Sequence, residues 1–270
     1  MTQNESEVKP PMNIMVFDTE TTSIEKPFCY NVGYVVLDTE THKKVLHKDF
    51  VVEQVWHNPM LFTTAYYADK RQLYVDRMRA RKCVMDKWGY IMAEMRRDIK
   101  TFDIQHAFAF NSPFDVGVFE FNCEWFKTLN PFDTVQVHDI RGYVHKFLAF
   151  TPKYQAFCDK YERYTESGNY STTAETVFQF IAEDSEFIEE HTALADSEIE
   201  CDILTECVAV YGAEWNTDYK VYQSIPRATL REFIVVDADG EKHIFAYTNK
   251  RKVGNFEGVR LSIKSKKGEE

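Results

Sequence analysis

Two acidic side chains, Asp18 and Glu20, follow directly on a short apolar run. The run, Ile14 to Phe17, has the β-branched and aromatic residues typical of a buried strand. Side chains two residues apart lie on the same face of a strand, so the two carboxylates are expected side by side. They repel each other there unless a cation lies between them. Because the chain has 43 Asp and Glu, the pair also fits a solvated strand end, and its spacing alone leaves both interpretations open.

Three further residues with suitable chemistry stand at the expected ends of elements. Asp115 comes shortly after the apolar run 106–110, at the expected start of a helix. His191 and Asp196 lie at the beginning of a strongly helical segment, 192–210. Taken singly, each has an ordinary explanation. A helix N-terminus favours an acidic side chain, and a lone histidine is usually a surface or hydrogen-bonded residue.

Together the four acids and the histidine match the needs of phosphodiester hydrolysis with two divalent metal ions. That reaction uses three or four carboxylates to hold ions about 3.5–4 Å apart. It also needs a group that accepts a proton from the attacking water near neutral pH, a task that suits histidine. The sequence therefore holds a candidate for each of these tasks.

The same residues lie in three motifs that resemble those of the DEDDh exonucleases, a family that includes the proofreading subunit of bacterial replicative polymerase and ribonuclease T. In chain order the motifs are Phe17-Asp18-Thr19-Glu20-Thr21-Thr22, Asn111-Ser112-Pro113-Phe114-Asp115 and His191-Thr192-Ala193-Leu194-Ala195-Asp196. The His-x4-Asp spacing of the third motif distinguishes this branch from its tyrosine-bearing relative. The resemblance covers about residues 12–211, although Phe110 stands where the family often has histidine.

This resemblance implies a ribonuclease-H-like fold and 3′→5′ removal of nucleotides from a single strand. It implies two Mg²⁺ or Mn²⁺ ions, held by the carboxylates of Asp18, Glu20, Asp115 and Asp196. Asp18 is then the candidate for bridging both ions and Glu20 for holding one. His191 is implied as the general base. The softer implied contacts to the substrate are Thr21, Thr22 and Asn111.

An α/β fold is expected to position these residues, with a mixed five-stranded sheet flanked by helices. The expected strands cover residues 14–20, 30–37, 44–55, 106–110 and 135–138. Helices are expected over 112–127 and 192–210, and an apolar helical stripe runs from Tyr66 to Lys100, interrupted by Arg81.

Smaller signals mark the ends of elements. Asp139 is a candidate N-cap, and Thr172 to Glu175 fits a capping box. Two apolar runs on either side of Asp237 to Lys242 predict a β-hairpin. We therefore expect an exonuclease domain over residues 12–216 and a small β-rich extension over 217–270.

Composition excludes several classes of protein. With 44% hydrophobic and 15% aromatic residues, the chain fits a folded globular protein. Its six cysteines show no Cys-x-x-Cys spacing, its N-terminus is polar and unlike a signal peptide, and no apolar run approaches membrane-spanning length. These features predict a cytoplasmic protein with reduced thiols and no membrane partner.

Charge is unevenly distributed along the chain. A net charge of −11 argues against a nucleic-acid partner, yet residues 70–100 hold ten Lys and Arg against four Asp and Glu. Residues 241–267 hold eight against two. Such basic stretches fit either solvated faces or contacts to phosphates.

The leading prediction is an exonuclease on single-stranded 3′ ends, with DNA favoured over RNA. The basic helix around Arg77 to Arg97, the basic C-terminal flank and exposed aromatic side chains would bind the strand. Two alternatives keep the chemistry: an exoribonuclease, and a proofreading subunit that docks on a polymerase or other replication protein through residues 217–270. A third is a non-catalytic nucleic-acid-binding protein on the same fold. A homo-oligomer is compatible with each.

Overall fold

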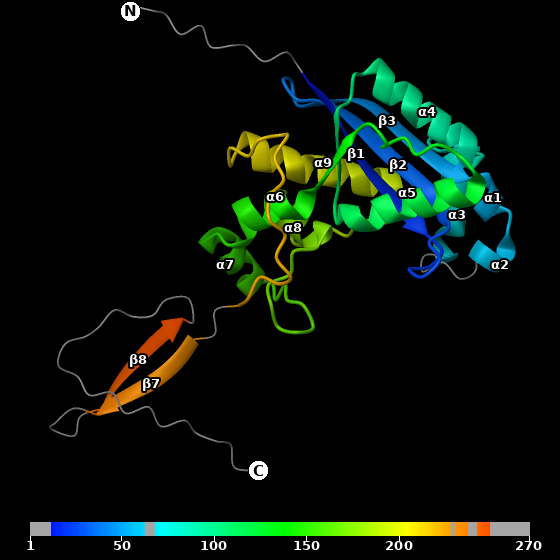
Figure 1. Cartoon of the computed structure of the whole chain (residues 1–270). Coiled ribbons are helices and arrows are strands. Elements are labelled where there is room, and N and C mark those ends of the chain that lie inside the picture. The colour runs from blue at the N-terminus through cyan, green and yellow to red at the C-terminus, as the bar shows by residue number, and fades with distance from the viewer. Residues whose placement is uncertain (1–11, 63–67, 228–229, 237–241, 249–270) are drawn as a thin grey trace, which may run out of the picture.

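The computed structural model describes residues 12–62, 68–227, 230–236 and 242–248. At its centre is a six-stranded mixed sheet with the strand order β4-β3-β2-β1-β5-β6 (Figure 1). The strands are β1 (Asn13–Thr21), β2 (Cys29–Asp38), β3 (Lys43–Val52), β4 (Val84–Asp86), β5 (His106–Ala109) and β6 (Gln136–Asp139). The first three form an antiparallel meander, and β4, β5 and β6 each join a neighbour in parallel. The predicted α/β class is confirmed, with one strand more than the five expected.

The additional strand, β4, lies inside the stretch predicted as helical. Two helices, α3 (Arg71–Arg79) and α4 (Trp88–Thr101), flank it. Arg81 follows the first helix with a left-handed φ of 58°, which turns the chain toward the sheet edge. The helical prediction is therefore correct on both sides of β4 and wrong within it. An edge strand of three residues is too short to show the alternation of apolar and polar residues that identifies a strand in a sequence.

The third predicted strand is also shorter than expected. β3 ends at Val52, and Glu53–Trp56 forms the short helix α1 instead of continuing the strand to Val55. Two more short helical segments follow, α2 (Pro59–Phe62) and η1 (Ala68–Lys70). Buried apolar residues, Val55 and Trp56, continue into α1. The hydrophobic pattern therefore does not show that the strand ends at Val52 and a helix begins.

The remaining helices are α5 (Ser112–Phe126), α6 (Ile140–Val144), η2 (His145–Ala149), α7 (Pro152–Lys160), α8 (Ala174–Ile181) and α9 (Ala193–Ala209). Among them, those predicted over 112–127 and 192–210 are confirmed as α5 and α9. Asp139 caps α6 as predicted, accepting a hydrogen bond from Arg141 N at 2.9 Å. The predicted capping box is wrong by one residue, since Thr173 caps α8 and Glu175 accepts from Glu189 N at 3.1 Å.

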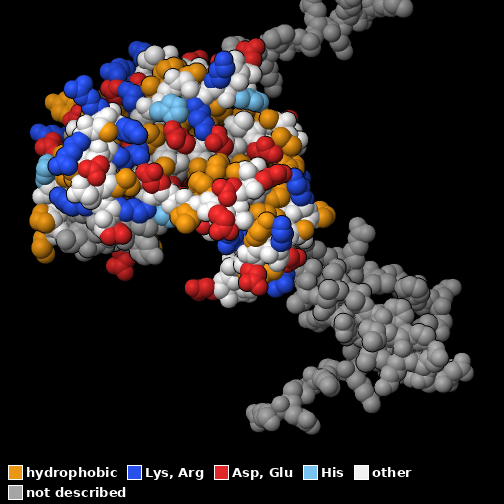
Figure 2. Space-filling view, turned by 180° about the vertical axis from the view of Figure 1, so that it is seen from behind, with side chains coloured by type: hydrophobic (Ala, Val, Ile, Leu, Met, Phe, Trp, Pro, Cys, Tyr) orange, Lys and Arg blue, Asp and Glu red, His pale blue; other side chains and the backbone are white. Residues whose placement is uncertain are grey.

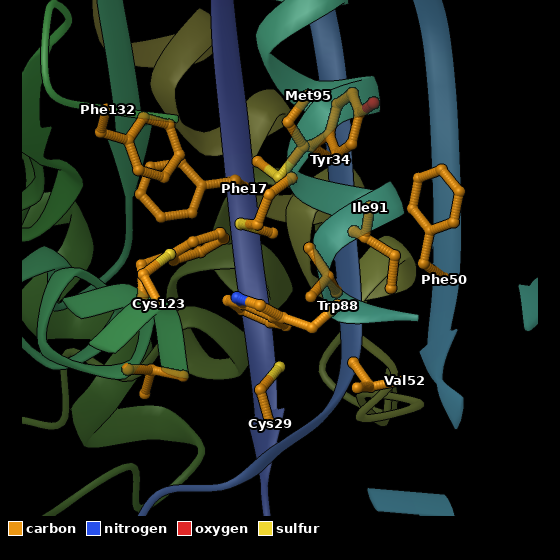
Figure 3. Packing of buried hydrophobic residues seen from close by; sticks show 14 of the residues in the cluster. Phe17, Cys29, Tyr34, Phe50, Val52, Trp88, Ile91, Met95, Cys123 and Phe132 are labelled. Atoms are coloured by element: carbon orange, nitrogen blue, oxygen red, sulfur yellow. The ribbon is translucent and has the colours of Figure 1, made fainter. Parts of the chain in front are cut away.

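Helices cover both faces of the sheet and form two hydrophobic clusters (Figure 1). On one face, α4 and α5 pack on Met15 and Phe17 of β1, and Phe17 stacks on Phe132 (Figure 3). On the other, α6, α8 and α9 pack on Ile14 and Val16. Successive β1 side chains therefore alternate between the two clusters, as a central strand requires.

After α9 the chain returns across the second face. Tyr143 OH donates to the Glu214 carbonyl at 3.1 Å, and Tyr170 N donates to the Ile225 carbonyl at 3.0 Å. Ile225 is 1% exposed. Residues up to at least Ile225 thus contact the α/β domain, past the predicted boundary at 216/217.

The predicted C-terminal hairpin is present as β7 (Leu230–Val236) and β8 (Lys242–Thr248), paired antiparallel. The N-terminal tail through Pro11 and most of the basic C-terminal flank, from residue 249 on, lie outside the described residues. Among the helices of the described ranges, none is both long and apolar enough to cross a membrane.

Candidate active site

The site begins at the C-terminal end of β1. Because Ile14 and Val16 face the α9 side of the sheet, the same alternation directs Asp18 and Glu20 to that side. Glu20 is 9% exposed, and its Oε2 accepts a hydrogen bond from Tyr30 OH at 3.4 Å. The predicted pair of carboxylates on one face is therefore observed.

Gly33 of β2 allows α9 to come close to this strand. It pairs with Asp18 across the sheet, and a Cβ atom on it would lie 2.1 Å from the backbone of Ala193. The first turn of α9 therefore lies almost on the strand, and Ser197 Oγ donates to the Gly33 carbonyl at 3.1 Å. This approach brings Asp196 to the acidic pair. One carboxylate oxygen from each of Asp18, Glu20 and Asp196 lies within 4.8 Å of the others.

Asp115 joins the site from α5, in the first turn of the helix as predicted. Its Oδ1 accepts hydrogen bonds from Thr19 N at 3.1 Å and from Thr19 Oγ1 at 2.7 Å. Asp115 is 2% exposed and is not part of the group of three that lie within 4.8 Å. Thr19, between the two acids of β1, thus fixes the fourth predicted carboxylate beside them.

Burial and mutual repulsion disfavour the charged forms of all four carboxylates. Burial is the main cause of the raised pKa of Asp18, and Asp115 and Glu189 add to it. Burial and then Asp18 raise the pKa of Glu20. Burial raises the pKa of Asp115 to about 7, and burial together with Asp18 raises that of Asp196 to about 10. A divalent cation would reverse these costs.

Asp196 also shows a polar atom suited to a cation. Its Oδ1 is buried and has no hydrogen-bond partner among the described residues. A buried acceptor left without a donor is costly, and a metal ligand is one of the roles that explains it. Oxygen donors of this kind are those that Mg²⁺ and Mn²⁺ prefer, so the residues present fit the predicted ions.

A fifth acid, Glu200, belongs to the same surroundings and was missing from the sequence prediction. It lies one helical turn after Asp196, is 3% exposed, and accepts from Phe110 N at 3.2 Å. Burial, followed by Asp18, Asp115 and Asp196, raises its pKa well above the usual range. The spacing of four residues on one helix was the signal that could have found it.

His191 lies just before α9 with a left-handed φ of 53°. The structure groups it with two acids, since atoms of Glu175, Glu189 and His191 lie within 4.8 Å of one another. Its Nδ1 is 3.5 Å from Glu189 Oε2. Burial and then Lys70 lower the pKa of His191, which leaves the neutral, proton-accepting form favoured near pH 7.

Glu189 connects this second group to the first. Burial and then Glu175 raise its pKa to about 7, and its charge in turn contributes to the raised pKa values of Asp18 and Asp196. Glu189 belongs to the acidic segment 183–190, which precedes His191 in the sequence. The structure brings this one member of the segment close enough to influence the predicted metal ligands.

The three softer substrate residues lie in different settings. Thr22 is 2% exposed, and its backbone N donates to the Phe28 carbonyl at 2.9 Å. Thr21 is partly exposed at the end of β1. Asn111 is exposed in a left-handed conformation before α5, and its backbone N donates to Asp139 Oδ1 at 3.1 Å. Thr21 is therefore partly exposed and Asn111 exposed to solvent, whereas Thr22 is buried.

Several residues of the predicted basic helix have structural partners. Arg77 binds the buried Asp49, with Nη2 to Oδ2 at 2.8 Å. Arg96 donates to the Leu129 carbonyl at 2.6 Å, and Arg97 pairs with Glu94. Seen from behind the view of Figure 1, Lys and Arg lie mainly toward the left, while Asp and Glu spread over the middle (Figure 2). Nucleic-acid contact by the whole basic stretch remains a prediction.

Comparison with known proteins places this geometry in a known fold. No family model and no curated protein matches the sequence. Among solved structures, the chain is similar to the nuclease domain of 3′hExo, a DEDDh family member, bound to rAMP. The sequence identity is 14% and the TM-score 0.53, over 78% of this chain and 98% of that one.

Two further similar structures are a full-length 3′-exonuclease (14% identity, TM-score 0.49, 81% of this chain and 68% of that one) and E. coli Exonuclease I with a dA16 oligonucleotide (14%, 0.45, 72% and 41%). At such low identity a likeness shows the fold alone, and of these three structures the nuclease domain of 3′hExo has the highest TM-score. The described domain therefore shares its fold, a mixed sheet flanked by helices, with the nuclease domain of 3′hExo.

Proposed function

We propose that this protein is a metal-dependent 3′→5′ exonuclease that acts on single-stranded 3′ ends, with DNA preferred over RNA. The observation that carries the proposal is the meeting of Asp18, Glu20 and Asp196 within 4.8 Å, with Asp115 held beside them through Thr19. Four carboxylates from three separate segments converge on one buried place. A structural role for such a cluster would be costly, whereas a phosphodiesterase requires it.

Each residue has a task in the proposed reaction. Asp18, Glu20, Asp115 and Asp196 would hold two ions, Mg²⁺ or Mn²⁺. When bound, such ions lower the pKa of a coordinated water and stabilise the charge that develops on the phosphate. His191 accepts the proton of the attacking water, and Glu189 beside Nδ1 orients its ring. Glu189 also stabilises the imidazolium that forms.

A direct test uses oligonucleotides of one sequence as DNA and as RNA, each labelled at the 5′ or the 3′ end. We expect release of mononucleotides from the 3′ end in Mg²⁺ or Mn²⁺, none in EDTA, and faster cleavage of DNA. Asp18→Ala and Asp196→Ala are expected to abolish release. Asp202→Asn is the matched control, because this acid of α9 pairs with Lys44 at 2.6 Å and lies outside the site.

The outcomes separate the alternatives. Faster cleavage of RNA would identify an exoribonuclease and overturn the DNA preference. Activity only after addition of a polymerase would favour a proofreading subunit. A parent protein that binds but never cleaves either oligonucleotide, or an Asp18→Ala variant as active as the parent, would contradict the enzymatic proposal.

A further inference from the structure

The segment that carries His191 is held at both ends by a polar cluster on the β2, β3 and α3 side of the site. This cluster, which we call the anchor cluster, consists of Asn31, Asp49, Tyr74 and Arg77. It lies where β2, β3 and α3 meet, and the side chain of Asp49 is 0% exposed. His191 itself has a left-handed backbone that a non-glycine residue rarely adopts without support.

On the N-terminal side of His191, the contact runs through Arg77. Its Nε and Nη2 bind Asp49 Oδ2 at 3.2 and 2.8 Å, and its Nη1 donates to Glu190 Oε1 at 2.9 Å. Lys70 Nζ donates to the Glu190 backbone carbonyl as well. Two cations of one helical region therefore hold the residue that precedes the histidine.

On the C-terminal side, the contact runs through Asn31. Its Nδ2 donates to Asp49 Oδ1 at 2.7 Å, while its Oδ1 accepts from Ala193 N at 2.8 Å. Tyr74 OH donates to the same Oδ1 at 3.0 Å. The buried carboxylate of Asp49 thus orders both Arg77 and Asn31. Their contacts to the chain lie on either side of His191.

The contact to Glu190 is not needed to bury Asp49. The carboxylate is already satisfied by the two Arg77 nitrogens and by Asn31, so that the third Arg77 nitrogen is available for another acceptor. That acceptor is a side chain with 45% exposure, which adds little to stability. The contact therefore fits a role in placing the segment better than a role in holding the fold together.

We propose that Arg77 and Asn31 are positioning residues that fix His191 relative to the carboxylates of Asp18 and Asp196. This inference rests on the proposed function, because it assigns a purpose to a base that the reaction needs. A catalytic group must be held to within a fraction of an ångström, and a loop residue reaches that accuracy only through fixed partners. The anchor cluster supplies them from rigid elements.

The first test changes the exposed end of the connection, where folding is not at risk. We expect Glu190→Ala to lower kcat by about tenfold with KM within about twofold of the parent. Glu190→Gln, which keeps an acceptor for Arg77, should restore most of the loss. Glu198→Ala is the control, since Glu198 has similar exposure and its partner is His47, at 2.7 Å.

The second test compares two buried tyrosines and does not depend on activity. Tyr74→Phe removes the hydroxyl that binds Asn31, and Tyr34→Phe removes one that binds Asp98 Oδ2 at 2.8 Å, outside the anchor cluster. Both tyrosines are 0% exposed. We expect faster hydrogen exchange of the Ala193 amide in Tyr74→Phe alone, together with a lower kcat.

The two proposals fail in different ways. If the parent cleaves nucleic acid and requires His191, but Glu190→Ala and Tyr74→Phe keep the parental kcat, the positioning role is wrong and the enzyme assignment stands. If the parent cleaves nothing while Ala193 exchange still rises in Tyr74→Phe, the cluster orders the segment but the catalytic purpose is overturned. A fall in kcat of the same size in the control variant Glu198→Ala would also contradict the positioning role.

Discussion

The Ser197 hydroxyl donates a hydrogen bond to the carbonyl oxygen of Gly33 at 3.1 Å. This contact joins the first turns of α9 to the strand that pairs with Asp18, and it exists only because residue 33 has no side chain. The distance between helix and sheet at this point decides whether Asp196 reaches the acids of β1. A glycine outside all three motifs thus sets the geometry of the site.

Replacing Gly33 with alanine is expected to separate Asp196 from Asp18. The new Cβ would lie 2.1 Å from backbone atoms of Ala193 and Leu194, which cannot move without shifting α9. We expect a loss of about 3 kcal/mol in the free energy of unfolding and loss of metal-dependent activity. Denaturant unfolding and nuclease assays measure the two effects.

Gly117→Ala is the matched control for that experiment. A Cβ atom on Gly117 of α5 would meet nothing within 4 Å, so alanine should be neutral or stabilise the helix by up to about 1 kcal/mol. Equal destabilisation by both substitutions would show that close packing at Gly33 is not the cause.

The metal-free protein should lose stability as pH rises. Burial raises the pKa of Asp115 to about 7 and that of Asp196 to about 10, both above their unfolded values near 4. Between pH 4 and these values the folded state binds more protons than the unfolded state, so the free energy of unfolding falls with pH. Thermal unfolding in EDTA from pH 5 to 8 tests this, and Mg²⁺ or Mn²⁺ should reverse the fall at pH 8.

Asp196→Asn extends the same argument to a single residue. With its pKa raised to about 10, Asp196 must take up a proton when the metal-free protein folds at pH 8, and the neutral amide of Asn removes that cost, so the variant should be more stable by about 1–3 kcal/mol while losing activity. A less stable Asp196→Asn variant in EDTA would show that the carboxylates do not repel one another as proposed. Asp202→Asn, on the same helix, should leave stability and activity close to those of the parent.

Glu200→Gln is expected to weaken metal binding without preventing it. The amide keeps an acceptor for Phe110 N but removes a negative charge beside the predicted ligands. Outer carboxylates of metal sites typically contribute tenfold or more to affinity, so the Mg²⁺ concentration for half-maximal activity should rise by about tenfold. A titration of activity against Mg²⁺ gives the result, and an unchanged midpoint would exclude Glu200 from the site.

His191→Ala should lower kcat by about 10²–10⁴-fold while leaving metal binding intact, because the histidine supplies proton transfer and no metal ligand. Stabilisation of the variant by Mn²⁺, followed by thermal unfolding, reports metal binding separately from turnover. Loss of that stabilisation would instead place His191 among the ligands.

The sequence correctly predicted the local placement of several candidate site residues. Asp18 and Glu20 share a face because strands have a period of two, and Asp115 opens a helix because apolar and turn residues mark its start. Partners distant in sequence were not predictable. Arg77 was assigned to a solvated or nucleic-acid-binding face, whereas it binds Asp49 of β3, which carries no signal of that pairing.

Other differences have equally local causes. β4 is too short to show a strand period, and Arg81 adopts a left-handed φ that composition does not reveal. Glu200 lay within reach of sequence reasoning, since it repeats the position of Asp196 after one turn, yet the family motif ends before it. Its burial, not its spacing, makes it part of the site.

The site is assembled from parts of the chain that are made at very different times during synthesis. Thr19 meets Asp115 across 96 positions, and Asn31 meets Ala193 across 162. Because the N-terminus leaves the ribosome first, β1 is made long before α9, and its acids have their full set of neighbours only after α9 has been made. A nascent chain that ends before residue 191 lacks both His191 and Asp196. If the proposed activity is correct, the growing polypeptide stays inactive until α9 has been made and has folded onto β1.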